Sequence, residues 1–185
     1  MHNYPKKFYF IDTFNEDHIN KLDKNIGIIY RNYSKKHDEL EIIKIKNLCK
    51  KTNHKFYLSN NTKLVDKLKL DGAYIPSFNK SLSVLYLKRK GIPIFGSAHN
   101  LKEIFQKVRQ QADLIFLSSV FKSRKSNKEL GINKFNILSN HTKKKIIALG
   151  GINKKNLSRI KLTKAYGFAS IAFFHKELKF KKKIL

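Results

Sequence analysis

The sequence predicts an α/β fold in which residues 1–185 form a single compact (β/α)8 TIM barrel with short helices and loops. Short runs rich in β-branched and aromatic residues alternate with segments of helical period, and this alternation occurs eight times. Several runs are apolar at consecutive positions, as is typical of parallel strands covered on both faces. An open doubly wound sheet is the alternative; eight strands favour the barrel, although 185 residues is short for one.

Eight candidate strands follow from the apolar runs. In chain order they are Lys7–Asp12, Ile26–Tyr33, Lys55–Asn60, Gly72–Ser77, Pro93–Ala98, Leu114–Val120, Lys145–Gly151 and Gly167–Phe174. The spacing between them leaves room for short helices and trimmed loops only.

Helical patterns lie between the strands. The connection after the first strand allows at most three turns. In the next, Ser34 is the expected N-cap, and Leu40, Ile43 and Leu48 follow at near-helical spacing. Four further helices are expected to begin at or near an asparagine that can cap the first turn: Asn61, Asn79, Asn100 and Asn153.

The charge of the chain raises an alternative function. Forty basic and thirteen acidic residues give a formal net charge of +27, which favours contact with nucleic acid, anionic membranes or phosphorylated molecules. The lysines are spread along the chain and only five basic residues are arginine. Because no recognition helix, RNP-like motif or zinc finger is present, a nucleic-acid-binding protein is the distant alternative and we expect no specific nucleic-acid partner.

Cys49, the single cysteine, lies in a helical pattern and cannot form an internal disulfide. The N-terminus lacks a signal-peptide hydrophobic region, and no apolar run approaches the roughly 20 residues needed to span a bilayer. We therefore expect a cytoplasmic protein that does not enter a membrane. A homo-oligomer remains open.

A glycine pair, Gly150 and Gly151, follows the seventh strand in "KIIALGGINKKNL". In a barrel, the loops after strands 7 and 8 often bind phosphate, and free amides at a helix N-terminus favour an anion. We expect a phosphate site made by Gly150, Gly151 and Ile152, with amides near Ile171 and Ala172 after the eighth strand. The alternative is a tight turn that binds nothing.

Four motifs in this order resemble the thiamine-phosphate synthase and TenI family of (β/α)8 barrels. "IIALGGINKKNL" resembles the family's strand 7 motif, and "ADLIFLSSVFKS" resembles its Gly-Ala-Asp-Tyr, apolar run and Pro-Val-Phe-x-Thr segment. "LDGAYIPS" is similar to Ala-Asp-Gly-Val-His-Leu-Gly, and "FGSAHNLKE" to Gly-x-Ser-x-His-x-x-x-Glu. The resemblance extends over nearly the whole chain.

The resemblance implies a role in thiamine biosynthesis. In the synthase reaction, hydroxymethylpyrimidine diphosphate ionises with the help of Mg²⁺ and is captured by thiazole phosphate, which releases pyrophosphate. The pyrophosphate and catalytic positions fall on Arg31, Ser97, Ser123 and Lys125. The two magnesium carboxylates fall on Asn60 and Asn79. Because an amide brings no charge, we expect these positions to hold the ion weakly unless the diphosphate supplies the binding.

Other positions depart from the family's pattern. Ile29 and Tyr33 replace the Gln and Lys of strand 2, and Ser119 stands where the TenI branch has a histidine. A second hypothesis is therefore a TenI-like member that binds a phosphorylated thiazole without synthase chemistry, as an isomerase, a binder or a partner subunit. Its partners would be phosphorylated small molecules, and Mg²⁺ is the expected cofactor only if the chain is a transferase.

Four further polar residues lie near the predicted strand ends. His99 is a candidate acid or base, or a residue that orients its loop. His175 is a candidate phosphate ligand or a solvated side chain. Asp12 lies at a strand end that faces the functional side, whereas Asp113 opens its strand and is expected to be structural.

Overall fold

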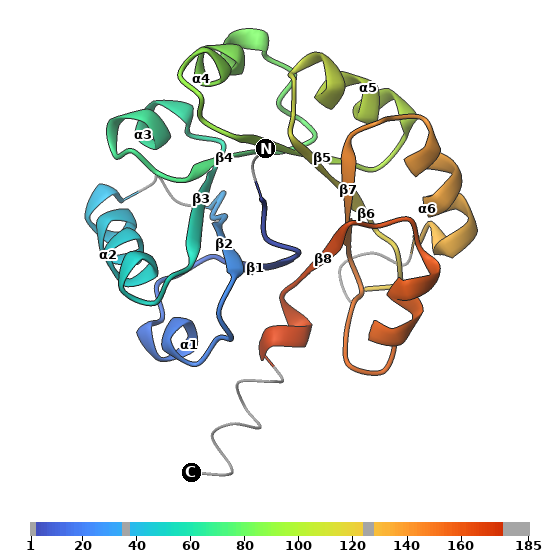
Figure 1. Cartoon of the computed structure of the whole chain (residues 1–185), viewed down its shortest axis with the longest axis horizontal. Coiled ribbons are helices and arrows are strands. Elements are labelled where there is room, and N and C mark those ends of the chain that lie inside the picture. Colours follow the sequence, from blue (N-terminus) through green and yellow to red (C-terminus); the bar gives the residue numbers. More distant parts are fainter. Residues whose placement is uncertain (1–2, 35–37, 124–127, 176–185) are drawn as a thin grey trace.

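The computed structural model describes residues 3–34, 38–123 and 128–175. Eight parallel strands pair in chain order and close into a barrel, which confirms the predicted TIM barrel (Figure 1). Closure is direct: β1 (Lys7–Ile11) pairs with β2 (Ile26–Tyr30) on one side and with β8 (Gly167–Ser170) on the other. The strands between them are β3 (Lys55–Ser59), β4 (Gly72–Ile75), β5 (Ile94–Ala98), β6 (Leu114–Ser118) and β7 (Lys145–Leu149).

Short helices surround this ring of strands. They are α1 (Glu16–Asn20), α2 (Glu39–Lys51), α3 (Thr62–Lys67), the 3₁₀ turn η1 (Leu82–Val84), α4 (Leu85–Arg89), α5 (Leu101–Arg109), α6 (Gly131–Asn140) and the 3₁₀ helix η2 (Leu157–Leu162). The predicted caps Asn61 and Asn100 each accept a hydrogen bond from the first turn of their helix. The helix α6 was not among the segments predicted from the sequence.

The predicted start of α2 was wrong. Asp38 caps this helix by accepting a hydrogen bond from the Leu40 amide, whereas the Ser34 side chain donates to Asn32. The buried face consists of Ile42, Ile45, Leu48 and Cys49, and Leu40 is 70% exposed.

The segment after β7 also differs from the prediction. No α-helix begins at Ile152; residues 154–156 form a turn, and η2 follows. The reason is local, because the Asn156 side chain accepts from the Asn153 amide and the Asn153 side chain accepts from the Lys155 amide. The predicted strand to Phe174 ends at Ser170, and residues 172–175 form a helical turn.

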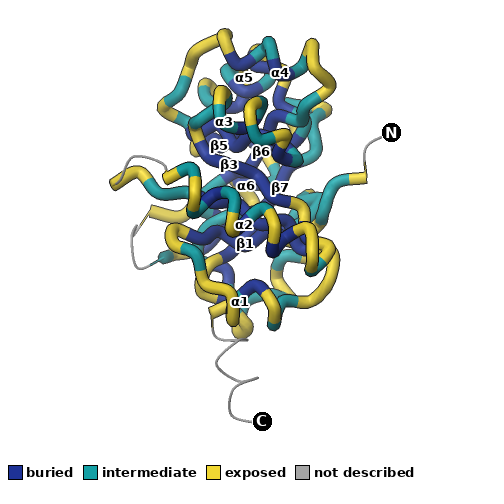
Figure 2. The backbone as a smooth tube through the Cα atoms, turned by 90° about the vertical axis from the view of Figure 1, so that its left-hand side faces the viewer, coloured by how far each residue is buried: buried dark blue, intermediate teal, exposed yellow. Residues whose placement is uncertain are grey.

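Aromatic side chains fill the interior of the barrel. Six rings pack there: Phe8, Phe10, Tyr57, Tyr74, Phe95 and Phe116. Strand glycines leave space for them, since a Cβ on Gly27 would lie 2.5 Å from the Phe8 ring. A second cluster fills the layer between strands and helices, and Figure 2 shows burial concentrated in the strands and in the inward faces of the helices.

Within the described ranges, no helix has both the length and the apolar character needed to cross a membrane.

Candidate functional site at the barrel mouth

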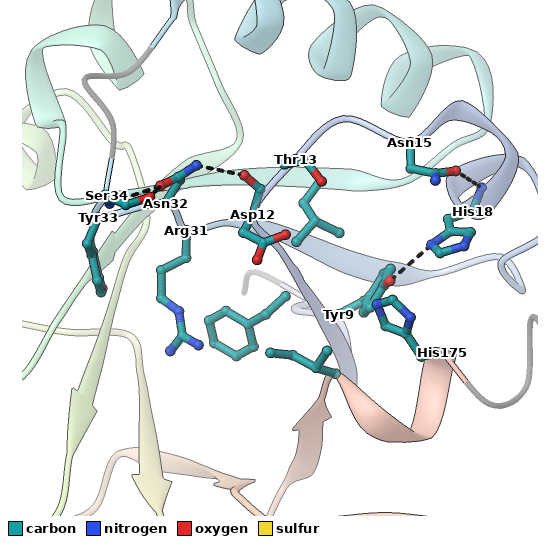
Figure 3. Close-up of a pocket in the computed structure, with 13 residues that line it drawn as sticks. Tyr9, Asp12, Thr13, Asn15, His18, Arg31, Asn32, Tyr33, Ser34 and His175 are labelled. Atoms are coloured by element: carbon teal, nitrogen blue, oxygen red, sulfur yellow. Dashed lines mark hydrogen bonds between the residues drawn. The ribbon is translucent and has the colours of Figure 1, made fainter. Parts of the chain in front are cut away.

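The carboxyl ends of the strands form the barrel mouth, and most of the predicted site residues lie around it. Arg31 follows β2, and its guanidinium lies 4.6 Å from the centroid of the Phe10 ring (Figure 3). Its backbone amide donates to the Ile11 carbonyl at 2.8 Å, which extends the pairing of β1 and β2. Arg31 therefore places a cation at the mouth, against the Phe10 ring, which with the other interior rings forms the aromatic floor of the mouth.

Ser97 is buried in β5, beneath the mouth. Burial raises the pKa of Tyr74 to about 12, and the nearby Ser97 hydroxyl and Arg31 charge oppose that increase. The tyrosine thus stays a neutral hydroxyl near two predicted site residues. Sequence reasoning missed Tyr74, because an aromatic residue in a strand is most simply explained as core.

The two candidate metal positions are brought into contact. The Asn79 amide nitrogen donates to the Asn60 side-chain oxygen at 2.8 Å, and the Asn79 side-chain oxygen accepts from the Ser81 amide at 3.0 Å. Neighbouring Tyr33 donates to or accepts from Ser59 at 3.1 Å, and its ring packs edge-on against Phe78.

These residues do not fit a resident Mg²⁺ ion. The ion prefers charged oxygen ligands in octahedral geometry. Here both amide oxygens already accept hydrogen bonds from within the chain. Over residues 3–34, 38–123 and 128–175, no group of three or more His, Cys, Asp or Glu side chains is placed to hold a metal.

Two of the predicted pyrophosphate residues, Ser123 and Lys125, follow β6 in the sequence. Ser123 is half-buried and Lys125 lies outside the described residues. The loop itself is well anchored where it is described: the Ser119 hydroxyl donates to the Phe121 carbonyl at 2.7 Å, and the Arg159 guanidinium lies 5.1 Å from the Phe121 ring.

The glycine pair after β7 is required by this loop. Gly150 and Gly151 have φ angles of +96° and +69°. A Cβ on Gly150 would overlap Ser119, and a Cβ on Gly151 would overlap the carbonyls of Phe121 and Lys122. The pair thus has a packing role whether or not a ligand binds.

Four backbone amides near this turn remain open. In the part of the chain that the structure describes, the amides of Gly151, Ile152, Ile171 and Ala172 have no hydrogen-bond partner. Ser170 joins the two segments, because its hydroxyl donates to the Ile152 carbonyl at 2.8 Å and accepts from the Phe173 amide at 3.1 Å. Sequence reasoning missed Ser170; its signal is a serine that ends a strand just before a helical turn.

A cavity of about 560 Å³ opens beside β1 and β2 and reaches Ile171 after β8 (Figure 3). Its polar lining comes from Asp12, Thr13, Asn15, His18, Arg31, Asn32, Ser34 and His175, with Tyr9 and Tyr33. The rings of His18 and His175 pack edge-on, with centroids 5.1 Å apart. The cavity connects two predicted site residues, Arg31 and Ile171, that lie far apart in the sequence.

Two of the remaining candidates have structural partners. The His99 ring bonds Glu103 at 2.9 Å, which supports a loop-orienting role. Asp113 pairs with Lys88 at 2.7 Å and accepts from the Ile94 amide, which supports the structural interpretation.

Comparison with known proteins adds to this geometry. A family model described as thiamine monophosphate synthase matches residues 24–174. A thiamine-phosphate synthase from Prochlorococcus marinus subsp. pastoris is 33% identical over 124 residues, which cover 65% of this chain and 35% of that protein. One from Methanococcus vannielii is 24% identical over 131 residues, covering 70% of this chain and 64% of that protein. The chain thus spans about a third of the length of the Prochlorococcus relative.

Among solved structures, a thiamine phosphate pyrophosphorylase from Pyrococcus furiosus superposes with a TM-score of 0.71 at 19% identity, covering 90% of this chain and 85% of that chain. N-(5'-phosphoribosyl)anthranilate isomerase from the same organism gives 0.64 at 13% identity, with 98% and 100% covered. Likeness at this level of identity shows the shared barrel fold alone.

Proposed function

Because the chain belongs to the thiamine monophosphate synthase family, we propose that it acts in thiamine biosynthesis as a transferase of the thiamine-phosphate synthase type. The reaction joins hydroxymethylpyrimidine diphosphate to thiazole phosphate and releases pyrophosphate. We propose that residues 1–185 form one barrel domain. The activity of the longer relatives is likewise assigned to this chain only as a proposal.

The open amides after β7 and β8 carry the proposal. The amides of Gly151, Ile152, Ile171 and Ala172 supply donors that do not depend on side-chain identity. Ser170 fixes the two segments relative to each other. Such a cradle suits the phosphate of a thiazole phosphate or of thiamine phosphate, because several N–H groups can share its oxygens.

The adjoining cavity suits the organic part of the substrates. Its volume, about 560 Å³, lies in the range of small-molecule sites. Arg31 would hold the pyrophosphate group as a permanent cation, with Ser123 and Lys125 from the β6 loop. Ser97 would assist from β5, beneath the reacting groups. Any Mg²⁺ would enter with the diphosphate substrate, since the chain provides no carboxylate at Asn60 or Asn79.

A second candidate is a binder of phosphorylated thiazole that has lost synthase chemistry. The contact between Asn60 and Asn79 favours it, because the two positions that carry the magnesium ligands in the resemblance are here occupied with each other. This member would act as an isomerase or a partner subunit, or would simply sequester the phosphate ester.

One experiment separates the two candidates. The purified chain is incubated with both substrates, with Mg²⁺ and with EDTA, and thiamine phosphate is measured by chromatography. Formation of thiamine phosphate supports the transferase. Absence of product in both conditions, with thiazole phosphate binding retained in calorimetry, would overturn the transferase in favour of the binder; absence of binding would overturn both.

A further inference from the structure

One face of α5 is bonded to the loop that carries Asn79. Three side chains in the last turn of α5 and at its C-cap donate to backbone carbonyls of residues 76–81. Lys107 donates to Pro76 at 2.7 Å and to Asn79 at 2.8 Å. Gln110 donates to the carbonyls of Asn79 and Ser81, and Gln106 donates to that of Lys80. The loop between β4 and η1 is therefore held by side chains, not by its own backbone alone.

Lys107 is the centre of this arrangement, and it is fully buried. Its third ammonium hydrogen is satisfied by Gln110 at 2.8 Å. Space for its stem comes from β5, where a Cβ on Gly96 would lie 2.6 Å from the Lys107 Cδ. Burial lowers the pKa of Lys107 to about 8, and Glu103 opposes that decrease. A buried ammonium is costly compared with an apolar side chain of the same size, so packing alone does not account for it.

The consequence appears at the mouth. With its backbone held from behind, Asn79 turns its amide toward the Asn60 oxygen. Asn60 has a left-handed φ of +58° and is exposed at the end of β3. Among the described residues the side-chain nitrogen Nδ2 of Asn60 has no hydrogen-bond partner, whereas its backbone amide donates to the Tyr74 carbonyl. An amide N–H can donate directly to a phosphate oxygen, whereas a carboxylate at this position would repel the anion unless a cation lay between them.

We propose that Lys107 is a positioning residue that holds the Pro76–Ser81 loop, so that the Asn60–Asn79 pair binds a diphosphate group directly through amide donors, without a divalent cation. For its ligand the inference rests on the proposed function. It goes beyond that function in one respect: α5 holds the Pro76–Ser81 loop in place before any ligand binds.

The first test uses inorganic pyrophosphate as the probe, in about 0.2 M salt so that the nonspecific attraction of a chain with net charge +27 is screened. Calorimetry in EDTA and in Mg²⁺ is expected to give affinities within about threefold of each other. The double variant Asn60→Asp, Asn79→Asp is expected to lose binding in EDTA and to regain it in Mg²⁺. If the native chain binds pyrophosphate in Mg²⁺ but not in EDTA, the proposal is overturned.

Asn53→Asp is the matched control. Asn53 is exposed, lies before the same strand β3 at its opposite end, and has φ +60°. Asn53→Asp adds one negative charge, where the double variant adds two, in the backbone conformation of Asn60 but away from the mouth. Its pyrophosphate affinity is therefore expected to match the native chain in both conditions. An equal loss in Asn53→Asp would mean that net charge alone explains the effect.

The second test addresses Lys107. Lys107→Met is expected to lower pyrophosphate affinity about tenfold, and Asn79→Ala by a similar factor. The combination is expected to lose no more than either change, since Lys107 acts through Asn79. Additive losses would overturn the positioning role. Lys102→Met, exposed on the same helix, is the control and should be unchanged.

Hydrogen exchange keeps the inference testable on the native chain. The amides of Asn79 and Ser81, which donate to the Pro76 carbonyl and the Asn79 side chain, are expected to be protected without metal or ligand. Rapid exchange there would overturn the proposal even if Lys107→Met failed to fold. Thiazole phosphate binding measured on the same samples tests the proposed function separately, so failure of one is not read as failure of the other.

Discussion

The two sides of the barrel mouth offer donors to an anion by different means. On the side of β7 and β8 the open donors are backbone amides, held by a glycine pair and by Ser170. On the side of β3 and β4 they are the side-chain amides of Asn60 and Asn79. Backbone donors persist through most substitutions because they belong to the fold, whereas side-chain donors can be exchanged one residue at a time. The first side therefore keeps the expected pattern, while the second departs from the carboxylates that the resemblance implies.

The largest expected effect breaks the backbone side. Gly151→Ala places a Cβ against the carbonyls of Phe121 and Lys122, in addition to the strain of a left-handed φ. We expect the free energy of unfolding to fall by about 3 kcal/mol and thiazole phosphate binding to be lost. Chemical denaturation and calorimetry measure both.

Gly91→Ala isolates the steric part of that effect. Gly91 has φ +70°, against +69° for Gly151, but no atom lies within 4 Å of its expected Cβ. Its cost is expected to be about 1 kcal/mol, from the φ angle alone. Equal costs at the two glycines would show that close approach of the β6 loop contributes nothing.

A smaller effect sharpens how the two backbone segments are joined. Ser170→Ala removes the hydrogen bond to Ile152 and the cap on the Phe173 amide. We expect a loss of about 1–2 kcal/mol in unfolding free energy, together with weaker thiazole phosphate binding. Ser139→Ala, which removes a buried hydroxyl bonded to Phe135 within α6, should destabilise the fold without weakening binding. Equal binding losses in both variants would remove Ser170 from the site.

The smallest expected effect is a pH dependence of stability from His54, which lies before β3 at the end of the barrel opposite the mouth. Burial lowers the pKa of His54, opposed by the carbonyls of Ile26 and Ile19. Below its ordinary pKa of 6.5 the unfolded chain binds this proton more readily than the folded chain, so stability falls as the pH falls. His54→Gln should flatten this slope by at most about 1.4 kcal/mol per pH unit in denaturation measured from pH 7 to 5. The exposed His141→Gln should leave it unchanged; an unaltered slope in His54→Gln would contradict the assignment.

Patterns near in sequence predicted the fold well. Strand runs and the caps Asn61 and Asn100 depend on neighbouring residues, and the structure confirms them. The helix α6 escaped prediction because it begins at a glycine and contains three asparagines, which are weak helix formers. Its burial of Phe135 and Leu138 against the barrel outweighs that weakness.

The site was harder to predict because its contacts are long-range. In the sequence, Lys107 cannot be distinguished from an exposed helical lysine. Its burial is explained by the space above Gly96 on β5 and by the backbone carbonyls near Asn79. The direct contact between Asn60 and Asn79 likewise depends on a left-handed residue after β3. Both asparagines were predicted as site residues from the sequence. The hydrogen bond between them depends on the position of the Pro76–Ser81 loop, which the sequence does not give.

The aromatic residues beneath the mouth also provide an intrinsic fluorescence signal for ligand binding. The chain has eight tyrosines and no tryptophan, so its near-ultraviolet emission comes from tyrosine. Tyr74 lies within the packed rings of the interior, where the nearby charge of Arg31 lowers its pKa against the effect of burial. An anion that draws on Arg31 alters the surroundings of that fluorophore, so ligand titrations can be followed in the unlabelled protein, and a single introduced tryptophan would be read without background.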